Sequence, residues 1–317
     1  MRLATFEVSG RTRVGIVTGE RPGQVLDVVA ACECVKASRE LAQAAGSMET
    51  LVAQLTDRRS ELEAVVTRAR KEAPDAFLER NRVNLCAPLL RPGKIVCLAG
   101  NYLEHIAESG YVKPAAGDVL TPQLFIKPST TLCGDGDVIA IEHMNGAIGW
   151  EVELAVVIGQ RAKSVSAQAA MQHVLGYTIL NDLSERKLNA RVTNRKVREL
   201  DTFCDWLVGK WFDGFAPCGP WIVTADEISD PHALDMKLSV NGELRQHGST
   251  EGMMFRIPEL IEYITSIMTL EPGDIISTGT PVGAGIGGKG KTLEDGDEVS
   301  CEIEGIGSIR NPVRRAE

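Results

Sequence analysis

The chain has 317 residues, 44% of them hydrophobic, which is long enough to bury one large core, or a large core and a small one. Its 43 acidic and 34 basic residues give a net charge of −9, and no run of Lys or Arg could follow a phosphate backbone, so nucleic acid is excluded as an expected partner. No apolar signal core follows Met1, and no apolar stretch approaches the roughly 18 residues that span a membrane, so we expect a cytoplasmic protein with no membrane contact.

The N-terminal region predicts strands followed by helices. Residues 2–8 and 12–18 are expected to form two strands joined by a turn, and residues 24–29 a third. Residues 38–72 are rich in Ala, Leu, Glu, Gln and Arg with helical spacing, interrupted at Gly46-Ser47, which predicts two helices.

A linker is expected at residues 88–93, because two prolines and a glycine there prevent a helix or a central strand. We therefore predict a small α/β N-terminal domain at residues 1–90 and a catalytic domain at residues 91–317.

Beyond the linker, short β-type runs are separated by Gly, Pro, Asn and Asp. We expect strands at residues 95–98, 124–127, 152–158, 177–181, 221–224, 236–240, 275–278 and 299–303. Helices are expected at residues 166–176 and 257–270. Because strands and helices do not alternate regularly, a doubly wound parallel sheet is disfavoured, and we predict an α+β fold that is mostly β.

Three carboxylates lie where a metal site could form. Glu151 and Glu153 are two apart in an expected strand, so their side chains leave the same face, and Asp182 ends another β-type run. Carboxylates gathered on adjacent strands repel one another unless a hard cation neutralises them, and all-oxygen ligation suits Mg²⁺, Mn²⁺ or Ca²⁺. The alternative is that the two glutamates form a solvated strand face and Asp182 caps a turn.

A series of motifs in a fixed order distinguishes these interpretations. They are K-I-V-C-L-A-G-N-Y-L-E-H at 94–105, F-I-K-P-S at 125–129, E-V-E at 151–153, G-Y-T at 176–178 leading to N-D at 181–182, N-G-E at 241–243, and T-G-T-P at 278–281. Together they resemble the fumarylacetoacetate hydrolase family over about residues 92–313. The resemblance implies a mixed β-sandwich roll, commonly a homodimer, and Mg²⁺ or Mn²⁺ on Glu151, Glu153 and Asp182, with Ca²⁺ as an alternative in crystals.

The resemblance also implies roles for other side chains. His105 and Glu108 match an H-x-x-E pair that activates water, and Lys210 matches a lysine expected to support a developing oxyanion. The matched substrate-binding positions are Lys127, Arg186, Asn189 and Thr280. Asn189 departs from the family pattern, in which a glutamine is frequent.

The resemblance implies a hydrolase that cleaves a C–C bond in a small 2,4-diketo acid, acylpyruvate-like or derived from a sugar acid, through a metal-stabilised enolate. An isomerase of the 2-hydroxyhepta-2,4-diene-1,7-dioate or 5-carboxymethyl-2-hydroxymuconate type, or an oxaloacetate-type decarboxylase, would use the same enolate. A non-catalytic metal-binding relative is the alternative from another class.

The glycine-rich segment 283–289 matches nucleotide-binding patterns by spacing alone. Gly290 replaces the required Ser or Thr, and the residues that follow are turn-like instead of helical, so we reject nucleotide binding.

Overall fold

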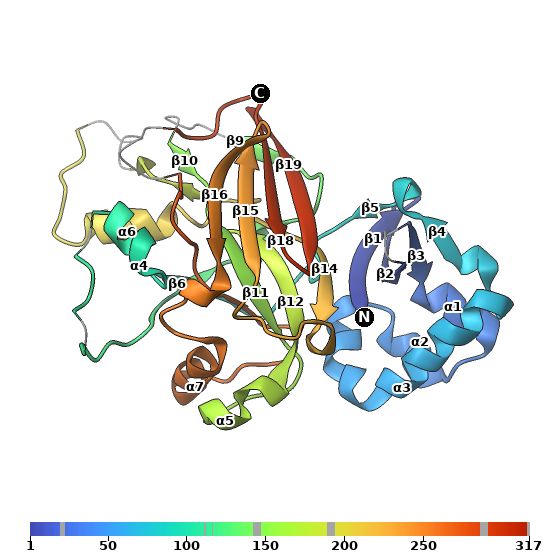
Figure 1. Ribbon diagram of the computed structural model, residues 1–317. Helices are drawn as coiled ribbons and strands as arrows, with labels where there is room; N and C mark the ends of the chain where they lie inside the picture. The colour runs from blue at the N-terminus through green and yellow to red at the C-terminus, as the bar shows by residue number, and fades with distance from the viewer. Residues whose placement is uncertain are drawn as a thin grey trace.

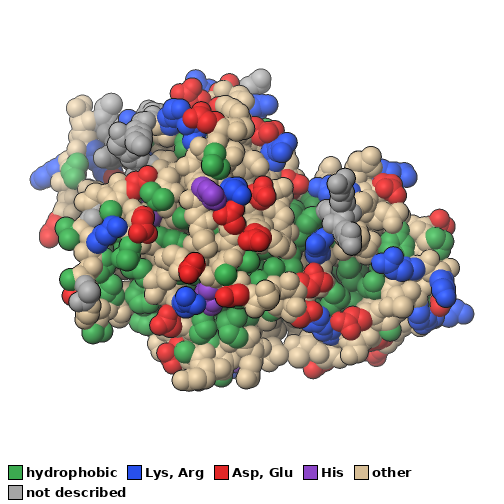
Figure 2. All heavy atoms as spheres, in the orientation of Figure 1, with side chains coloured by type: hydrophobic (Ala, Val, Ile, Leu, Met, Phe, Trp, Pro, Cys, Tyr) green, Lys and Arg blue, Asp and Glu red, His purple; other side chains and the backbone are tan. Residues whose placement is uncertain are grey.

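The computed structural model describes residues 1–19, 23–110, 112–115, 117–141, 147–188, 194–285 and 291–315. Figure 1 shows a smaller part formed by the N-terminal strands and helices beside a larger, strand-rich body. The predicted α+β, mostly β fold is confirmed. Acidic and basic side chains are interspersed over the face shown in Figure 2.

Three strands and three helices open the chain. They are β1 (Arg2–Val8), β2 (Arg11–Thr18), β3 (Gln24–Asp27), α1 (Val28–Val35), α2 (Arg39–Ala44) and α3 (Met48–Glu72), followed by the short strands β4 (Phe77–Glu79) and β5 (Asn84–Leu85). The predicted third strand is too long, because the carboxylate of Asp27 accepts a hydrogen bond from the Ala30 amide at 3.1 Å and caps α1. The two predicted helices are confirmed, and Ser47 caps the longer one.

A 12-stranded sheet runs through both parts of the molecule. Its remaining strands are β6 (Ile95–Ala99), β7 (Gln123–Lys127), β8 (Leu132–Cys133), β11 (Val152–Ile158), β12 (Val174–Asn181), β14 (Ala216–Thr224) and β17 (Ile275–Ser277). The main order is β4-β3-β2-β1-β14-β12-β11-β17-β6-β7. Because β1 pairs with β14, backbone pairing continues across the expected boundary after residue 90, and the two-domain division stays a prediction.

A five-stranded sheet packs against one face of the large sheet. It consists of β9 (Ile139–Ile141), β15 (Asp235–Val240), β16 (Glu243–Ser249), β18 (Glu298–Ile303) and β19 (Gly307–Arg315), and a further pair joins β10 (Ile148–Gly149) to β13 (Ser184–Glu185). Leu154 of β11, Leu238 of β15 and Val299 of β18 share the buried core between the sheets. Burial of these apolar side chains between the sheets stabilises the larger body.

The helices of the larger body lie at its margins (Figure 1). They are α4 (Leu103–Glu108), α5 (Ala167–Ala170), α6 (Asp201–Val208) and α7 (Ile257–Ile267). The helix predicted for residues 166–176 is wrong at its end: α5 is short, and Val174 already begins β12, where pairing with β11 overrides local helix propensity. Within the described ranges, none of the helices has the length and apolar character needed to cross a bilayer.

Candidate metal and acid–base site

The pairing register of two strands gathers the three predicted metal ligands. Val152 of β11 lies opposite Asn181 of β12, so the next pair outward is Glu151 and Asp182, and the Asp182 amide donates to the Glu151 carbonyl at 2.9 Å. Strand alternation places Glu153 on the face opposite the inter-sheet core. The ligand oxygens of Glu151, Glu153 and Asp182 all lie within 4.8 Å of one another, and all three side chains are buried.

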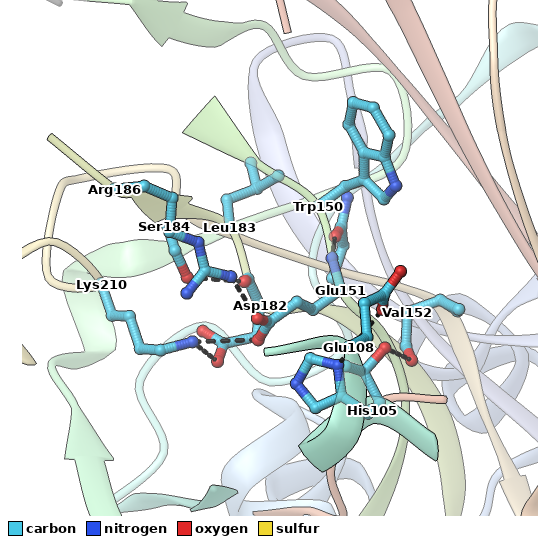
Figure 3. Close-up of polar contacts among 12 residues, drawn as sticks. His105, Glu108, Trp150, Glu151, Val152, Asp182, Leu183, Ser184, Arg186 and Lys210 are labelled. Carbon is cyan, nitrogen blue, oxygen red and sulfur yellow. Dashed lines mark hydrogen bonds and ion pairs between the residues drawn. The ribbon is translucent and has the colours of Figure 1, made fainter. Parts of the chain in front are cut away.

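Three cations neutralise part of this acidic cluster, and Figure 3 shows two of them, Lys210 and Arg186. The Lys210 ammonium lies 2.5 Å from Asp182 Oδ2 and 2.9 Å from Glu151 Oε2. The Lys127 ammonium lies 2.6 Å from Asp182 Oδ1, and the Arg186 guanidinium donates to Glu151 Oε1. Lys127 and Arg186, predicted to bind substrate, therefore contact the carboxylates directly in this structure.

The two glutamates of the E-x-E motif have opposite electrostatic environments. Burial would raise the pKa of Glu151, but the adjacent Lys210 and Arg186 outweigh it and hold that pKa below its ordinary value. Burial raises the pKa of Glu153, and the charges of Asp182 and Glu151 raise it further. The charge of Lys210 and the hydrogen bond from Ser277 lower the pKa of Glu153, but they do not offset the effects that raise it.

Glu153 is oriented by residues that the sequence analysis did not select. Its Oε2 accepts hydrogen bonds from Ser277 Oγ at 2.5 Å and from the Gly279 amide at 2.9 Å. Gly279 has φ +89°, and a Cβ there would lie 2.8 Å from the Cβ of Asn101, so only glycine fits. The sequence indicated these two donors only by their position, because Ser277 precedes the T-G-T-P motif and Gly279 lies within it.

Thr280 and Gln246 fix the start of β11. Thr280 Oγ1 donates to the Val152 carbonyl at 2.9 Å and accepts from Gln246 Nε2 at 2.9 Å, while Gln246 Oε1 accepts from the Val152 amide at 2.9 Å. The Thr280 hydroxyl is therefore engaged with the protein, and its role toward substrate stays a prediction. Asn189 lies outside the described residues.

Lys210 sits in an aromatic enclosure beside the carboxylates. Its ammonium lies 5.2 Å from the Phe125 ring centroid and 5.5 Å from that of Trp206. Burial alone would lower the pKa of Lys210, but Asp182 and Glu151 raise it overall, so this side chain stays charged. The predicted role of Lys210 in supporting an oxyanion requires this charge.

The predicted acid–base pair lies on α4, on the side of the acidic cluster (Figure 3). His105 is 8% exposed, its Nδ1 lies 3.8 Å from Glu108 Oε2, and that nitrogen has no hydrogen-bond partner among the described residues. Burial lowers the pKa of His105; the charge of Glu151 opposes this shift without cancelling it. The imidazole is therefore held in its neutral form at physiological pH, which is the form required of a base.

The donor set fits a hard divalent cation. Three buried carboxylates offer only oxygen, and a cation beside Glu153 would offset the burial and the negative charges that raise its pKa. Mg²⁺ and Mn²⁺ share this ligand preference, so the donor set by itself does not distinguish them.

The sequence of the larger body matches the model of the fumarylacetoacetate (FAA) hydrolase C-terminal domain over residues 94–314. The chain belongs to the fumarylacetoacetate hydrolase family. Human oxaloacetate tautomerase FAHD2A, a mitochondrial protein, is 39% identical over 267 residues, which cover 83% of this chain and 81% of that protein. The predicted cytoplasmic location stays a prediction.

Solved structures of related enzymes share the whole fold. Maleylpyruvate hydrolase from Sphingobium sp. SYK-6, in complex with manganese(II) and pyruvate, is 30% identical with a TM-score of 0.75, and all of both chains is covered. 5-Carboxymethyl-2-hydroxymuconate delta-isomerase from Mycobacterium smegmatis is 28% identical with a TM-score of 0.69, again over both full chains. Members of the family thus include hydrolases, isomerases and tautomerases.

Proposed function

We propose that this chain is a divalent-metal-dependent enzyme that moves a proton on a small 2-oxo acid, with keto–enol tautomerisation of an oxaloacetate-like acid as its reaction. The observation that carries the proposal is the buried cluster of Glu151, Glu153 and Asp182 with the neutral imidazole of His105 on the same side. The more similar relatives, among them the human oxaloacetate tautomerase, support this choice of reaction.

Glu151, Glu153 and Asp182 would hold Mg²⁺ or Mn²⁺, which when bound would act as a Lewis acid on the 2-oxo group. The His105 imidazole would take a proton from C3 of the acid, and the electron pair left behind would spread onto the 2-oxo oxygen. Return of that proton to the oxygen yields the enol, so no other reactant is needed. The charged Lys210 would stabilise the oxygen while it is negative.

C–C cleavage of a 2,4-diketo acid is the second candidate, and the spacing of His105 and Glu108 supports it. Residues three apart on a helix share a face, so Glu108 can orient the imidazole to deprotonate a water. The hydroxide would add to the C4 carbonyl, and cleavage of C3–C4 would leave a carboxylic acid and the enolate of a 2-oxo acid. The related maleylpyruvate hydrolase supports this alternative.

A panel with Mn²⁺ or Mg²⁺ separates the candidates. Enol-to-keto conversion of oxaloacetate is followed by ultraviolet absorbance, and cleavage of an acylpyruvate by the release of pyruvate. Glu151→Gln tests dependence on the metal, and His105→Gln tests dependence on the base. Tautomerisation lost in both variants supports the proposal, cleavage alone would replace it with the hydrolase, and inactivity of the folded, metal-loaded protein would refute both.

A further inference from the structure

The backbone of Gly283 connects the strand of metal ligands to the acid–base pair. Its amide donates to Glu108 Oε2 at 2.8 Å, and its carbonyl accepts from the Trp150 indole Nε1 at 3.1 Å. The Gly285 amide returns to the Trp150 carbonyl at 3.1 Å. Trp150 is 3% exposed and directly precedes Glu151, so its indole position is fixed by the same segment that holds the first metal ligand.

The backbone at Gly283 has little freedom to move. Gly283 has φ +95°, and a Cβ at this position would lie 2.4 Å from the carbonyl oxygen of Arg245. Close contact with Arg245 on β16, and the hydrogen bond from the Trp150 indole to the Gly283 carbonyl, limit rotation of the backbone on either side of the Gly283 amide that donates to Glu108. A rigid donor fixes the direction of the carboxylate that accepts from it.

Glu108 needs such a donor because its own helix constrains it weakly. The helix α4 has six residues and ends at Glu108, and that side chain is 29% exposed. The carboxylate nevertheless lies 3.8 Å from the buried, unpartnered Nδ1 of His105. A shift of well under 1 Å would close a hydrogen bond between them, since N–H···O distances are about 2.7–3.2 Å.

We propose that Trp150 is a positioning residue for the acid–base pair. Its indole N–H holds the Gly283 carbonyl, the Gly283 amide on the other side of the same Cα sets the Glu108 carboxylate, and the carboxylate orients the His105 imidazole. The inference rests on the proposed function in taking His105 as the base, but it applies equally to tautomerisation and to cleavage. It also gives a role to Gly283, the first residue of the glycine-rich segment for which we rejected nucleotide binding.

Trp150→Phe tests this relay, because it removes the indole N–H and keeps an aromatic ring. Loss of one hydrogen bond predicts a fall in kcat of about three- to tenfold, with KM changed by less than about twofold. The matched control is Trp221→Phe on β14, which removes another buried indole donor, to the Ile306 carbonyl at 2.7 Å, outside the hydrogen bonds that join Trp150, Gly283 and Glu108. We expect kcat of the control to remain within about twofold of the wild type.

A double-mutant cycle separates positioning from general loss of structure. In the Glu108→Ala background, Trp150→Phe should lower kcat by less than about twofold, because the relay has already been cut. Equal losses in both backgrounds would overturn the proposal. So would a fall in kcat for Trp221→Phe as large as that for Trp150→Phe.

Hydrogen exchange measured by mass spectrometry supplies a test that needs no substrate. The proteolytic fragment that contains Gly283 should exchange its amide hydrogens faster in Trp150→Phe and in Glu108→Ala than in the wild type and in Trp221→Phe. Unchanged exchange in Trp150→Phe would overturn the relay even if activity fell. If exchange responds as expected but none of the substrates turns over, the relay stands and the proposed function fails.

Discussion

Replacing Glu153 by Gln should stabilise the metal-free protein at pH 8, although this residue is a predicted metal ligand. Burial and the charges of Asp182 and Glu151 raise the folded-state pKa of Glu153 above its ordinary 4.5. The folded protein therefore keeps a proton that the unfolded chain releases, so stability falls as pH rises from 4.5 to the folded pKa and then levels off. A neutral glutamine removes this loss.

The gain in stability from Glu153→Gln follows from how far the pKa of Glu153 is raised in the folded protein. Each unit of difference between the folded and unfolded pKa corresponds to about 1.4 kcal/mol. Glutamine keeps a side-chain oxygen that can accept from Ser277 Oγ and from the Gly279 amide, so these hydrogen bonds are retained. We expect a gain of roughly 1–3 kcal/mol at pH 8, which for a chain of this size is an increase in Tm of roughly 2–6 °C. Below pH 4.5 the gain should shrink toward zero, because the glutamate then becomes protonated in the unfolded state as well.

Glu151→Gln is the matched control, since it changes the other glutamate of the same motif. Lys210 and Arg186 hold the pKa of Glu151 below its ordinary value, so its charge stabilises the folded state above pH 4.5, and this contribution is lost as pH falls. Removing one partner of a buried ion pair costs about 3–5 kcal/mol, so Tm at pH 8 should fall.

Circular dichroism melts in EDTA at pH 5, 6.5 and 8 would measure both effects. Adding Mn²⁺ should raise the Tm of the wild type and should have little effect on either variant. The electrostatic reasoning is wrong if both substitutions shift Tm at pH 8 in the same direction, or if the gain from Glu153→Gln does not grow with pH.

Three further predictions concern the neighbouring side chains. His105→Gln should lower kcat by about 10²–10⁴-fold while the Mn²⁺-dependent rise in Tm is kept, and the acidic limb of the wild-type pH–rate profile should lie below pH 6.5, because burial lowers the pKa of His105. Lys210→Met should destabilise the metal-free protein by about 3–5 kcal/mol in urea unfolding, since it leaves Asp182 and Glu151 with one cation fewer. Gly283→Ala should lower kcat, because a Cβ placed 2.4 Å from the Arg245 carbonyl must displace the backbone amide that holds Glu108. Expressed as a free energy, this fall in kcat should exceed the loss of stability inferred from the change in Tm.

The gathering of the three carboxylates could be predicted from the sequence because its geometry is local, whereas their role as metal ligands was implied by the family resemblance. Spacing of two in a strand places Glu151 and Glu153 on one face, and Asp182 directly follows β12, the next strand that pairs with β11. The position of His105 relative to Glu108 is likewise a property of one helical turn. In each case the decisive contact lies within a strand pair or a helix, where residue spacing determines direction.

The residues that orient this cluster could not be predicted in the same way. Ser277 reaches Glu153 across 124 positions, Gln246 reaches Val152 across 94, and Gly283 reaches Glu108 across 175. Each contact depends on how distant strands and loops meet, and serine, glutamine and glycine are common in loops for other reasons. The sequence likewise gave no sign that Lys127 and Arg186 would bind carboxylates of the cluster itself.

The end of α5 shows the same limit for secondary structure. Residues 166–176 have a local pattern that favours a helix, yet Val174 pairs with Ile158 and Gly176 with Val157 of β11. Gly176 also approaches β14 so closely that a Cβ there would lie 2.1 Å from the Val223 carbonyl. Pairing on both sides of β12 decides its length, and β12 in turn positions Asp182.

Deleting residues 1–90 should damage the catalytic site instead of merely removing an accessory region. The deletion takes away β1, which pairs Arg2 with Val223 and Leu3 with Ile222, and leaves β14 as a sheet edge that presents apolar residues beside β12. Because Asp182 directly follows β12, loosening this strand should weaken Mn²⁺ binding, measured by calorimetry, and should promote aggregation, measured by light scattering. A truncated chain that stays monodisperse under the same conditions as the full chain and binds Mn²⁺ equally well would show that β14 holds its place without β1.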